Sequence, residues 1–214
     1  MSEEKIFGSK QYKLSKLDFS DLNPDPFLQF KKWYGEILKS EEKFPNAMVL
    51  STANKEGYPS SRIVLLKGYN KKSFRFYTNS NSKKASEITD NPLCSLCFWW
   101  SLLERQVRIE GNVVILPDTK TDKYFETRPR PSQIGAWISD QSMVLDSRET
   151  LENKFEEFEK AHAKKKIKRP EFWKGYGVVP TLFEFWQGRD SRLHDRFRYH
   201  LTNNSKWKID RLYP

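Results

Sequence analysis

The sequence is poor in cysteine, glycine and histidine. Its 214 residues include 2 Cys, 9 Gly and 3 His. Two cysteines cannot cross-link a chain of this length into a disulfide scaffold. Cys94 and Cys97 lie in an expected strand, where residues three apart point to opposite faces, and no second Cys/His pair follows to complete a zinc site. We therefore expect both cysteines to be small core residues, and we expect no metal.

Several familiar motifs are also missing. The sequence has no Gly-x-Gly-x-x-Gly, no Gly-Lys-Ser/Thr and no Gly-x-Ser-x-Gly, so dinucleotide, P-loop and triad chemistry lack their signatures. It has no apolar run of membrane-spanning length, which predicts a protein without a membrane segment. The acidic start has no apolar segment, and we expect a cytoplasmic protein without a secretory signal.

Basic and aromatic residues are abundant. The chain carries 38 Lys or Arg against 28 Asp or Glu, a formal charge of +10, together with 15 Phe, 9 Tyr and 7 Trp. The basic excess indicates either a polyanionic or phosphorylated partner or a dispersed, solvated surface, and charge alone leaves both open. The length suits one domain. We expect a mobile arm over residues 1–22 and a single domain over residues 23–214.

The pattern of apolar residues favours an antiparallel β-barrel with flanking helices, a mainly β (α+β) fold. Five short strands follow one another at meander spacing without long helices between them. The expected strands are residues 47–52, 60–67, 73–78, 93–100, 106–116 and, after an interval of helices, 177–187, 196–201 and 206–212. Asp25, Asp118 and either Asp146 or Ser147 are candidate N-caps, for a first helix beginning at Pro26, for residues 119–127 and for a longer helix; residues 132–139 form another.

Basic residues stand beside hydroxyl and aromatic residues at three places. Arg62 and Lys67 bracket an apolar strand, and Lys83-Lys84 follow Tyr77-Thr78 at the expected start of a helix. A helix N-terminus beside cationic side chains suits a phosphate group. Each of these residues taken alone is more often an ion-pair or solvent residue.

The second place is Tyr124, Arg128 and Ser132, where four-residue spacing puts Tyr124 and Arg128 on one helix face. This group predicts either a second phosphate seat or an arginine that neutralises a helix end. The third place is the loop 186–196, rich in Arg and containing His194. Guanidinium groups both stack and fork, which favours a flat anionic ligand there.

Longer motifs resemble one family, the pyridoxamine/pyridoxine 5′-phosphate oxidases. They are residues 62–67, 76–79, 103–107, 128–137, 184–188, 192–196 and 207–212, in order along nearly the whole chain from about Asn23. The resemblance implies a homodimer of antiparallel, FMN-binding split β-barrels, with each flavin between the two subunits.

The resemblance also implies roles for individual residues. Arg192 and His194 are the implied catalytic residues. The implied FMN contacts are Arg62, Ile63, Val64, Leu65, Leu66, Lys67, Tyr77, Thr78, Lys83, Lys84, Gln106, Gln141, Ser142, Trp186 and Arg196. The implied substrate contacts are Lys67, Tyr124, Arg128, Ser132, Arg192, Leu193, His194 and, from the arm, Tyr12. Two positions depart from the family pattern: Lys83 stands where the family often has Arg, and Ser9, beside Lys10, stands where an arginine of the arm is expected.

The implied reaction is oxidation of pyridoxamine or pyridoxine 5′-phosphate to pyridoxal 5′-phosphate, a step of vitamin B6 metabolism. Hydride passes from substrate C4′ to flavin N5, and O2 is the acceptor, giving H2O2 and, from the amine, NH3. One alternative is a nucleic-acid-binding barrel in which the aromatic residues of strand 73–78 stack on bases. Another is a split-barrel flavin or heme binder without this activity. The oxidase interpretation expects no nucleic-acid partner.

Overall fold

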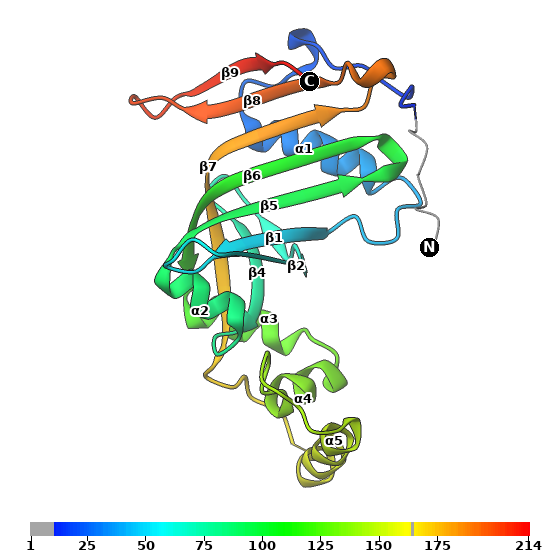
Figure 1. Ribbon diagram of the computed structural model, residues 1–214. Coiled ribbons are helices and arrows are strands. Elements are labelled where there is room, and N and C mark those ends of the chain that lie inside the picture. The colour runs from blue at the N-terminus through cyan, green and yellow to red at the C-terminus, as the bar shows by residue number, and fades with distance from the viewer. Residues whose placement is uncertain (1–10, 164) are drawn as a thin grey trace, which may run out of the picture. The chain divides into compact units, whose positions relative to one another are not determined.

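The computed structural model describes residues 11–163 and 165–214, and its backbone alternates strands with short helices (Figure 1). The helices are α1 (Pro26–Ile37), α2 (Lys83–Asp90), α3 (Asp118–Glu126), α4 (Arg130–Ile138) and α5 (Arg148–His162), with short 3-10 turns at Phe19–Asp21, Ser101–Leu103 and Asp190–Arg192. The strands are β1 (Ala47–Ala53), β2 (Pro59–Leu65), β3 (Gly68–Tyr69), β4 (Phe74–Asn79), β5 (Leu93–Trp100), β6 (Arg105–Ile115), β7 (Trp173–Gln187), β8 (Asp195–Leu201) and β9 (Trp207–Leu212).

The strands of the described residues hydrogen-bond in the order β2-β1-β5-β6-β7-β4-β3, and β8 adds to β7 and β9 to β8. The pairs β4–β7, β7–β8 and β8–β9 are antiparallel. The chain also divides into two compact units. Among the described residues, the first contains 11–48, 97–109 and 181–214, and the second contains 49–96, 110–163 and 165–180. The predicted antiparallel β fold with flanking helices is confirmed.

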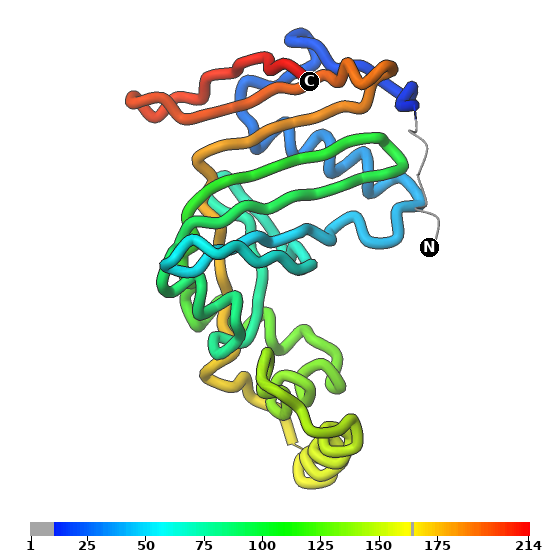
Figure 2. The backbone as a smooth tube through the Cα atoms, in the orientation of Figure 1, coloured from blue at the N-terminus to red at the C-terminus, as the bar shows by residue number. Residues whose placement is uncertain are grey.

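The first unit has an aromatic core around α1. Asp25 caps this helix by accepting a hydrogen bond from Phe27 N at 2.9 Å, and Pro26 is its first residue, as predicted. Phe30, Trp33 and Ile37 recur at helical spacing and are at most 1 % exposed. They pack on aromatic side chains of the strands, for example Trp33 edge-on to Phe185. The antiparallel hairpin β8–β9 is the C-terminal part of the chain and belongs to this unit (Figure 2).

The second unit contains the other part of the apolar core. Phe74 and Phe76 on β4 have no exposed surface, so they cannot stack on bases as the nucleic-acid alternative requires. Phe125, Ile134, Ile167 and Trp173 form a separate buried cluster beside the helices. At Gly111 on β6 a Cβ atom would stand 2.1 Å from the Val179 carbonyl oxygen of β7. Only glycine permits this close approach of two backbones.

Several boundaries differ from the predictions. Asp118 is the first residue of α3 rather than its cap, because Pro117 takes the N-cap position. Helix α4 begins two residues early, at Arg130, after Pro129. Of the two candidate caps of α5, Ser147 is the cap, accepting from Thr150 N. Strand β7 begins at Trp173, four residues before the predicted start, because Gly175 and Gly177 continue the strand instead of ending it.

The remaining sequence predictions have mixed outcomes. Cys94 is buried, and burial raises the pKa of its thiol to about 12, whereas Cys97 is only half-buried. No helix in the described part of the chain combines the length and apolar character needed to cross a membrane. Ser9 and Lys10 of the predicted arm lie outside the described residues. The division into an arm and one domain stays a prediction.

The described part of the arm is anchored within the first unit. Lys13 N and Leu14 N both donate to Glu104 Oε2, at 2.9 and 3.1 Å. Leu17 N donates to Asp195 Oδ2 at 3.0 Å, and the Leu17 side chain is buried. These contacts fix the backbone next to Tyr12.

Candidate functional site

A cavity of about 740 Å³ opens in the second unit, where the ends of β2 and β4 meet α3 and α4. Its wall combines apolar residues of β2 with hydroxyl, amide, aromatic and cationic residues. The predicted site residues in this wall are Ile63, Val64, Leu65, Lys67, Tyr77, Thr78, Lys84, Tyr124, Arg128, Ser132 and Gln141. The structure therefore brings together two groups that the sequence placed about fifty residues apart.

Lys84 is a buried cation on the cavity wall. Its residue is 8 % exposed, and its Nζ lies 3.2 Å from Thr78 Oγ1, 3.3 Å from Ser82 Oγ and 3.4 Å from Gln141 Oε1. All three oxygens are uncharged. Burial, and secondarily the charge of Arg62, lower the pKa of Lys84. A buried ammonium group among neutral oxygens is suited to an anionic ligand.

The first turn of α2 lies beside this ammonium group. Ser82 is the N-cap, but its hydroxyl makes no capping hydrogen bond to the helix backbone. Lys83 N instead donates to Ser142 Oγ at 3.2 Å, and Ser142 has a positive φ of 76°. The start of a helix concentrates backbone donors and a positive dipole. This geometry confirms the predicted helix start at Lys83.

A second cation, Arg128, lies on the aromatic side of the same cavity. Its guanidinium carbon is 4.7 Å from the ring centre of Trp173 and 5.6 Å from that of Phe125. Its Nη1 atom is buried and has no hydrogen-bond partner within the described chain. Burial lowers the pKa of Arg128. A buried guanidinium nitrogen without an acceptor is costly unless a ligand provides one.

Arg128 does not share a helix face with Tyr124, contrary to the prediction. Helix α3 ends at Glu126, and Arg128 is the second residue after it. The two side chains nevertheless line one cavity, because the turn into α4 directs Arg128 toward Trp173.

Three aromatic rings form a stack beside Arg128. The ring centres of Tyr77 and Tyr124 are 4.1 Å apart, and those of Tyr77 and Trp173 are 5.2 Å apart, with nearly parallel planes. Lys67 Nζ lies 5.9 Å from the Tyr124 ring. Trp173 was missed by the sequence reasoning because the predicted strand began only at residue 177. Trp173 N closes a turn by donating to the Pro170 carbonyl oxygen at 2.9 Å, and the proline at position 170 was the signal in the sequence.

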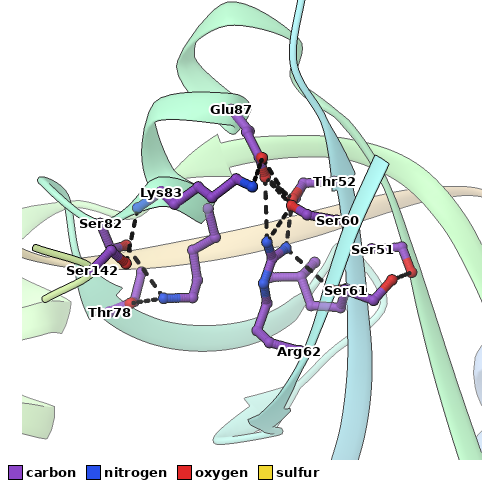
Figure 3. Close-up of polar contacts among 12 residues, drawn as sticks. Ser51, Thr52, Ser60, Ser61, Arg62, Thr78, Ser82, Lys83, Glu87 and Ser142 are labelled. Atoms are coloured by element: carbon purple, nitrogen blue, oxygen red, sulfur yellow. Dashed lines mark hydrogen bonds and ion pairs between the residues drawn. The ribbon is translucent and has the colours of Figure 1, made fainter. Parts of the chain in front are cut away.

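Arg62 directly precedes Ile63, which lines the cavity, but its terminal nitrogens contact Thr52, Ser60 and Glu87 instead. Nη1 donates to Thr52 Oγ1 and Nη2 to Ser60 Oγ, both at 2.5 Å (Figure 3). Nη2 also lies 3.3 Å from Glu87 Oε2, on helix α2. The sequence reasoning gave no role to Glu87. Leu66, predicted with Arg62 as a cofactor contact, is a buried residue.

A second cluster of predicted residues lies in the first unit. The ring of Trp186 is 4.5 Å from that of His194, and Tyr12 is edge-on to both, at 5.6 and 5.7 Å. Trp99 joins the cluster, 5.9 Å from Trp186, and sequence reasoning missed it. At Gly188 a Cβ atom would lie 2.8 Å from Tyr12, so the close approach of the arm depends on glycine.

His194 is held as an uncharged ring. Its Nδ1 atom accepts a hydrogen bond from Arg189 N at 3.1 Å, which requires that atom to be unprotonated. Burial, followed by the charge of Arg192, lowers the pKa of His194. Arg192 itself is exposed and has a positive φ of 62°, and Leu193 is 69 % exposed.

Arg196 forms a two-pronged pair with a buried carboxylate. Nε and Nη2 donate to the two oxygens of Glu184 at 3.0 and 3.1 Å, and Nη1 donates to Tyr213 O. Such a pair fixes the plane of the guanidinium group. Gln106 lies on β6 in the same unit. The cofactor and substrate roles predicted for these residues stay predictions.

The antiparallel sheet with flanking helices and a cation-lined, aromatic cavity defines a split-barrel ligand-binding protein. Residues 37–162 match the sequence family described as "Pyridoxamine 5′-phosphate oxidase", and residues 173–214 match "Pyridoxine 5′-phosphate oxidase C-terminal dimerisation region". The pyridoxine/pyridoxamine 5′-phosphate oxidases of Nostoc punctiforme and Aliarcobacter butzleri are 49 % and 46 % identical to this chain, over 96 % and 95 % of it and 96 % of each relative.

Solved structures agree on the fold. PhzG from Burkholderia lata, crystallised with tetrahydrophenazine-1-carboxylic acid, superposes with a TM-score of 0.89 at 28 % identity, over 96 % of this chain and 100 % of that one. An FMN-binding protein from Nostoc punctiforme superposes with a TM-score of 0.70 at 15 % identity, over 88 % and 97 % of the two chains. The chain belongs to the pyridoxamine 5′-phosphate oxidase family.

Proposed function

We propose that this chain is an FMN-dependent oxidase that converts pyridoxamine 5′-phosphate or pyridoxine 5′-phosphate to pyridoxal 5′-phosphate, with O2 as acceptor. The proposal rests mainly on one observation. The cavity has two separate cations, Lys84 beside hydroxyl and amide oxygens and Arg128 beside aromatic rings, and each can bind the phosphate of a flat phosphorylated ligand. A phosphorylated flavin and a phosphorylated pyridine require two such places. The close relatives named above support the same activity.

The residues around Lys84 fit the phosphate of FMN. The ammonium group contacts only uncharged oxygens of its three neighbours, and the first turn of α2 adds backbone donors. Bound FMN would supply the redox chemistry: it would accept a hydride from the substrate carbon, and that hydride together with one proton would reduce O2 to H2O2. The cofactor contacts we assign are Arg62, Ile63, Val64, Leu65, Leu66, Lys67, Tyr77, Thr78, Lys83, Lys84, Gln106, Gln141, Ser142, Trp186 and Arg196.

The residues around Arg128 bind the phosphate of the substrate. A phosphate oxygen gives the buried Nη1 of Arg128 the acceptor that the protein does not provide. Lys67 adds a second positive charge, and Tyr124 and Ser132 add hydroxyl groups on the same wall. A guanidinium group that is already fixed against Trp173 loses little conformational entropy on binding.

Arg192, Leu193 and His194 orient the pyridine ring. With Nδ1 of His194 engaged by Arg189 N, the remaining ring nitrogen, Nε2, carries the proton and acts as a hydrogen-bond donor. Tyr12 packs against the imidazole ring and restricts its rotation. The role of this group is to hold the reacting carbon in one pose, which lowers the entropic part of the barrier.

We also propose that the active form is a homodimer. Strand β2 lies at the end of the sheet, none of its residues is buried, and Ile63 and Leu65 are 64 % and 39 % exposed. An edge strand with exposed apolar side chains favours association, and a second copy of the chain would cover it. The match of residues 173–214 to a dimerisation region supports this. We place the enzyme in the cytoplasm, where its two free thiols stay reduced.

An absorption spectrum of the purified protein tests the proposal. We expect a flavin spectrum that bleaches on anaerobic addition of pyridoxamine 5′-phosphate and returns on admission of air. A flavin spectrum that ignores both B6 substrates would contradict the oxidase activity and favour another split-barrel function. A colourless protein that takes up neither FMN nor heme would contradict cofactor binding altogether.

A further inference from the structure

Glu87 is a buried carboxylate to which neither the predicted site nor the proposed chemistry gives a role. It lies on α2, one turn after the lysines that line the start of the helix, and it is 5 % exposed. Its side chain points toward β1 and β2, where Thr52 Oγ1 donates to Oε2 at 2.5 Å and Ser60 Oγ donates to the same oxygen at 2.6 Å (Figure 3).

The two hydroxyl groups connect Glu87 to Arg62. Thr52 Oγ1 accepts from Nη1 of Arg62 and donates to Glu87, and Ser60 Oγ accepts from Nη2 and donates to Glu87. Nη2 also contacts Glu87 directly, and Nη1 contacts the Leu50 carbonyl oxygen. The two terminal nitrogens thus have four acceptors, which is as many as their hydrogens can serve. The guanidinium plane is therefore fixed from β1, β2 and α2 at once.

Glu87 also sets the charge of this region. Burial raises the pKa of Glu87. The hydrogen bonds from Ser60 and Thr52 and the charge of Arg62 lower the pKa by more than burial raises it, so the pKa lies below its ordinary value. The group is therefore ionised at neutral pH. Lys83 Nζ is 3.8 Å from Glu87 Oε1, and Lys84 is close enough for its pKa to respond to both Arg62 and Glu87. Three cations and one carboxylate leave a net charge of +2, which matches a phosphate dianion.

We propose that Glu87 is a positioning residue for the cofactor phosphate: through Thr52 and Ser60 it holds the positive charge of Arg62 in place near Lys84, and this fixed charge adds to that of Lys84 in attracting the phosphate. This inference rests on the proposed FMN-dependent function. Glu87 itself does not touch the cofactor. It acts through the orientation of Arg62 and through the net charge of the phosphate site, to which it contributes its own negative charge.

Two effects of removing the carboxylate charge oppose each other. Glu87→Gln removes a negative charge near the phosphate, and by Coulomb attraction alone this would strengthen anion binding. It also replaces an accepting oxygen by an NH2 group, which faces the hydroxyl groups of Thr52 and Ser60 and the guanidinium group of Arg62. Hydrogen bonds between these groups and residue 87 are then lost, and the guanidinium group of Arg62 is no longer held in its orientation. Positioning predicts the second outcome, because short hydrogen bonds to an ionised group are stronger than a screened charge interaction.

The experiment measures the dissociation constants of FMN and of riboflavin, which lacks the phosphate, for the refolded apoprotein by quenching of flavin fluorescence. For Glu87→Gln we expect the FMN dissociation constant to rise about 10-fold or more, and the riboflavin constant to change less than about 2-fold. An unchanged or tighter FMN constant would overturn the proposal, and so would an equal weakening of FMN and riboflavin. Failure of the wild-type apoprotein to bind FMN would instead contradict the proposed function.

Two further variants make the test independent of charge and of folding. Ser60→Ala removes one connecting hydroxyl without changing any charge, so we expect weaker FMN binding in the same direction, by about 3- to 10-fold. No loss with Ser60→Ala would contradict the positioning role even if Glu87→Gln fails to fold. Asp122→Asn is the matched control, since it neutralises a carboxylate bound to Arg169 at 2.6 Å in the same unit, away from the cavity wall. It should leave both constants unchanged.

Discussion

Arg128 is the residue whose environment most directly indicates a ligand. Its guanidinium group stacks on Trp173 and its Nη1 atom is buried without a hydrogen-bond partner in the described residues. Stacking explains why the group stays in place, but it does not satisfy the buried N–H group. The spacing placed Arg128 near Tyr124, and the two residues line one cavity, but the prediction that both lie on one helix is wrong because α3 ends at Glu126.

We predict that Arg128→Ala raises KM for pyridoxamine 5′-phosphate by about 10- to 100-fold, because one charged hydrogen bond to phosphate is lost. The measurement is steady-state kinetics with the phosphorylated substrate and with unphosphorylated pyridoxamine. Arg128→Lys keeps the charge but not the flat group, and we expect it to recover only part of the affinity. Equal effects on both substrates would contradict the phosphate role.

His194 predicts a pH effect with a definite sign. Burial, and then the charge of Arg192, hold its pKa below the ordinary value of 6.5. In the pH range between these two pKa values the unfolded chain binds more protons at this residue than the folded chain does. The free energy of unfolding therefore has its full value above pH 6.5 and falls as the pH decreases through this range.

The test is chemical denaturation of the wild-type protein and of His194→Gln at a series of pH values from 5 to 8. We expect the wild-type protein to lose stability relative to the variant as the pH falls below about 6.5. A difference that does not change with pH, or one that changes in the opposite direction, would show that His194 is not held as a neutral ring.

At the scale of single elements, Gly111 and Gly35 make a matched pair. A Cβ atom at Gly111 would meet the Val179 carbonyl oxygen at 2.1 Å, whereas at Gly35, within α1, nothing lies within 4 Å. We predict that Gly111→Ala lowers the free energy of unfolding by about 1–3 kcal/mol through overpacking. Gly35→Ala should raise it by about 0.5–1 kcal/mol, because alanine favours the helix.

Thermal and urea denaturation of the two variants measure this difference. The second substitution controls for the general effect of adding a methyl group to a glycine. Destabilisation of similar size by both substitutions would contradict the close approach of β6 and β7 at Gly111.

The helices differ in how far their own residues determine them. Helix α1 begins where Asp25 caps it and Pro26 starts it, and both signals are local. For α3 and α4 the caps are Pro117 and Pro129, neither of which supplies a capping side chain. Their starts are therefore set by the proline and by packing of Phe125 and Ile134 in a shared cluster. The side-chain capping hydrogen bond that marks the start of α1 is absent at these two starts.

At the scale of the whole molecule, the apolar edge strand β2 predicts association. Ile63 and Leu65 are exposed on a strand of which no residue is buried. We predict that the wild-type protein sediments with twice the mass of one chain and that Ile63→Arg shifts it toward the single chain. The same substitution should also weaken FMN binding, because Ile63 lines the cavity that we propose for the cofactor.

Sedimentation equilibrium at several protein concentrations makes the measurement. Leu38→Arg is the control, since Leu38 is 55 % exposed at the end of α1 and far from β2 in sequence. A wild-type protein that stays a single chain at all concentrations would contradict the homodimer. So would an Ile63→Arg variant with an unchanged mass.

Short-range patterns in the sequence control one part of this structure. Alternating apolar residues gave the strands, Asp25 and Pro26 gave the start of α1, and motifs spread along the chain indicated the family, all of which depend on neighbouring residues or on residue identity. Packing between separate elements places Arg128 on Trp173 and connects Glu87 to Arg62 through two hydroxyl groups. These contacts join residues 25 to 45 positions apart, and no periodicity records them, because they arise only when separate elements pack together.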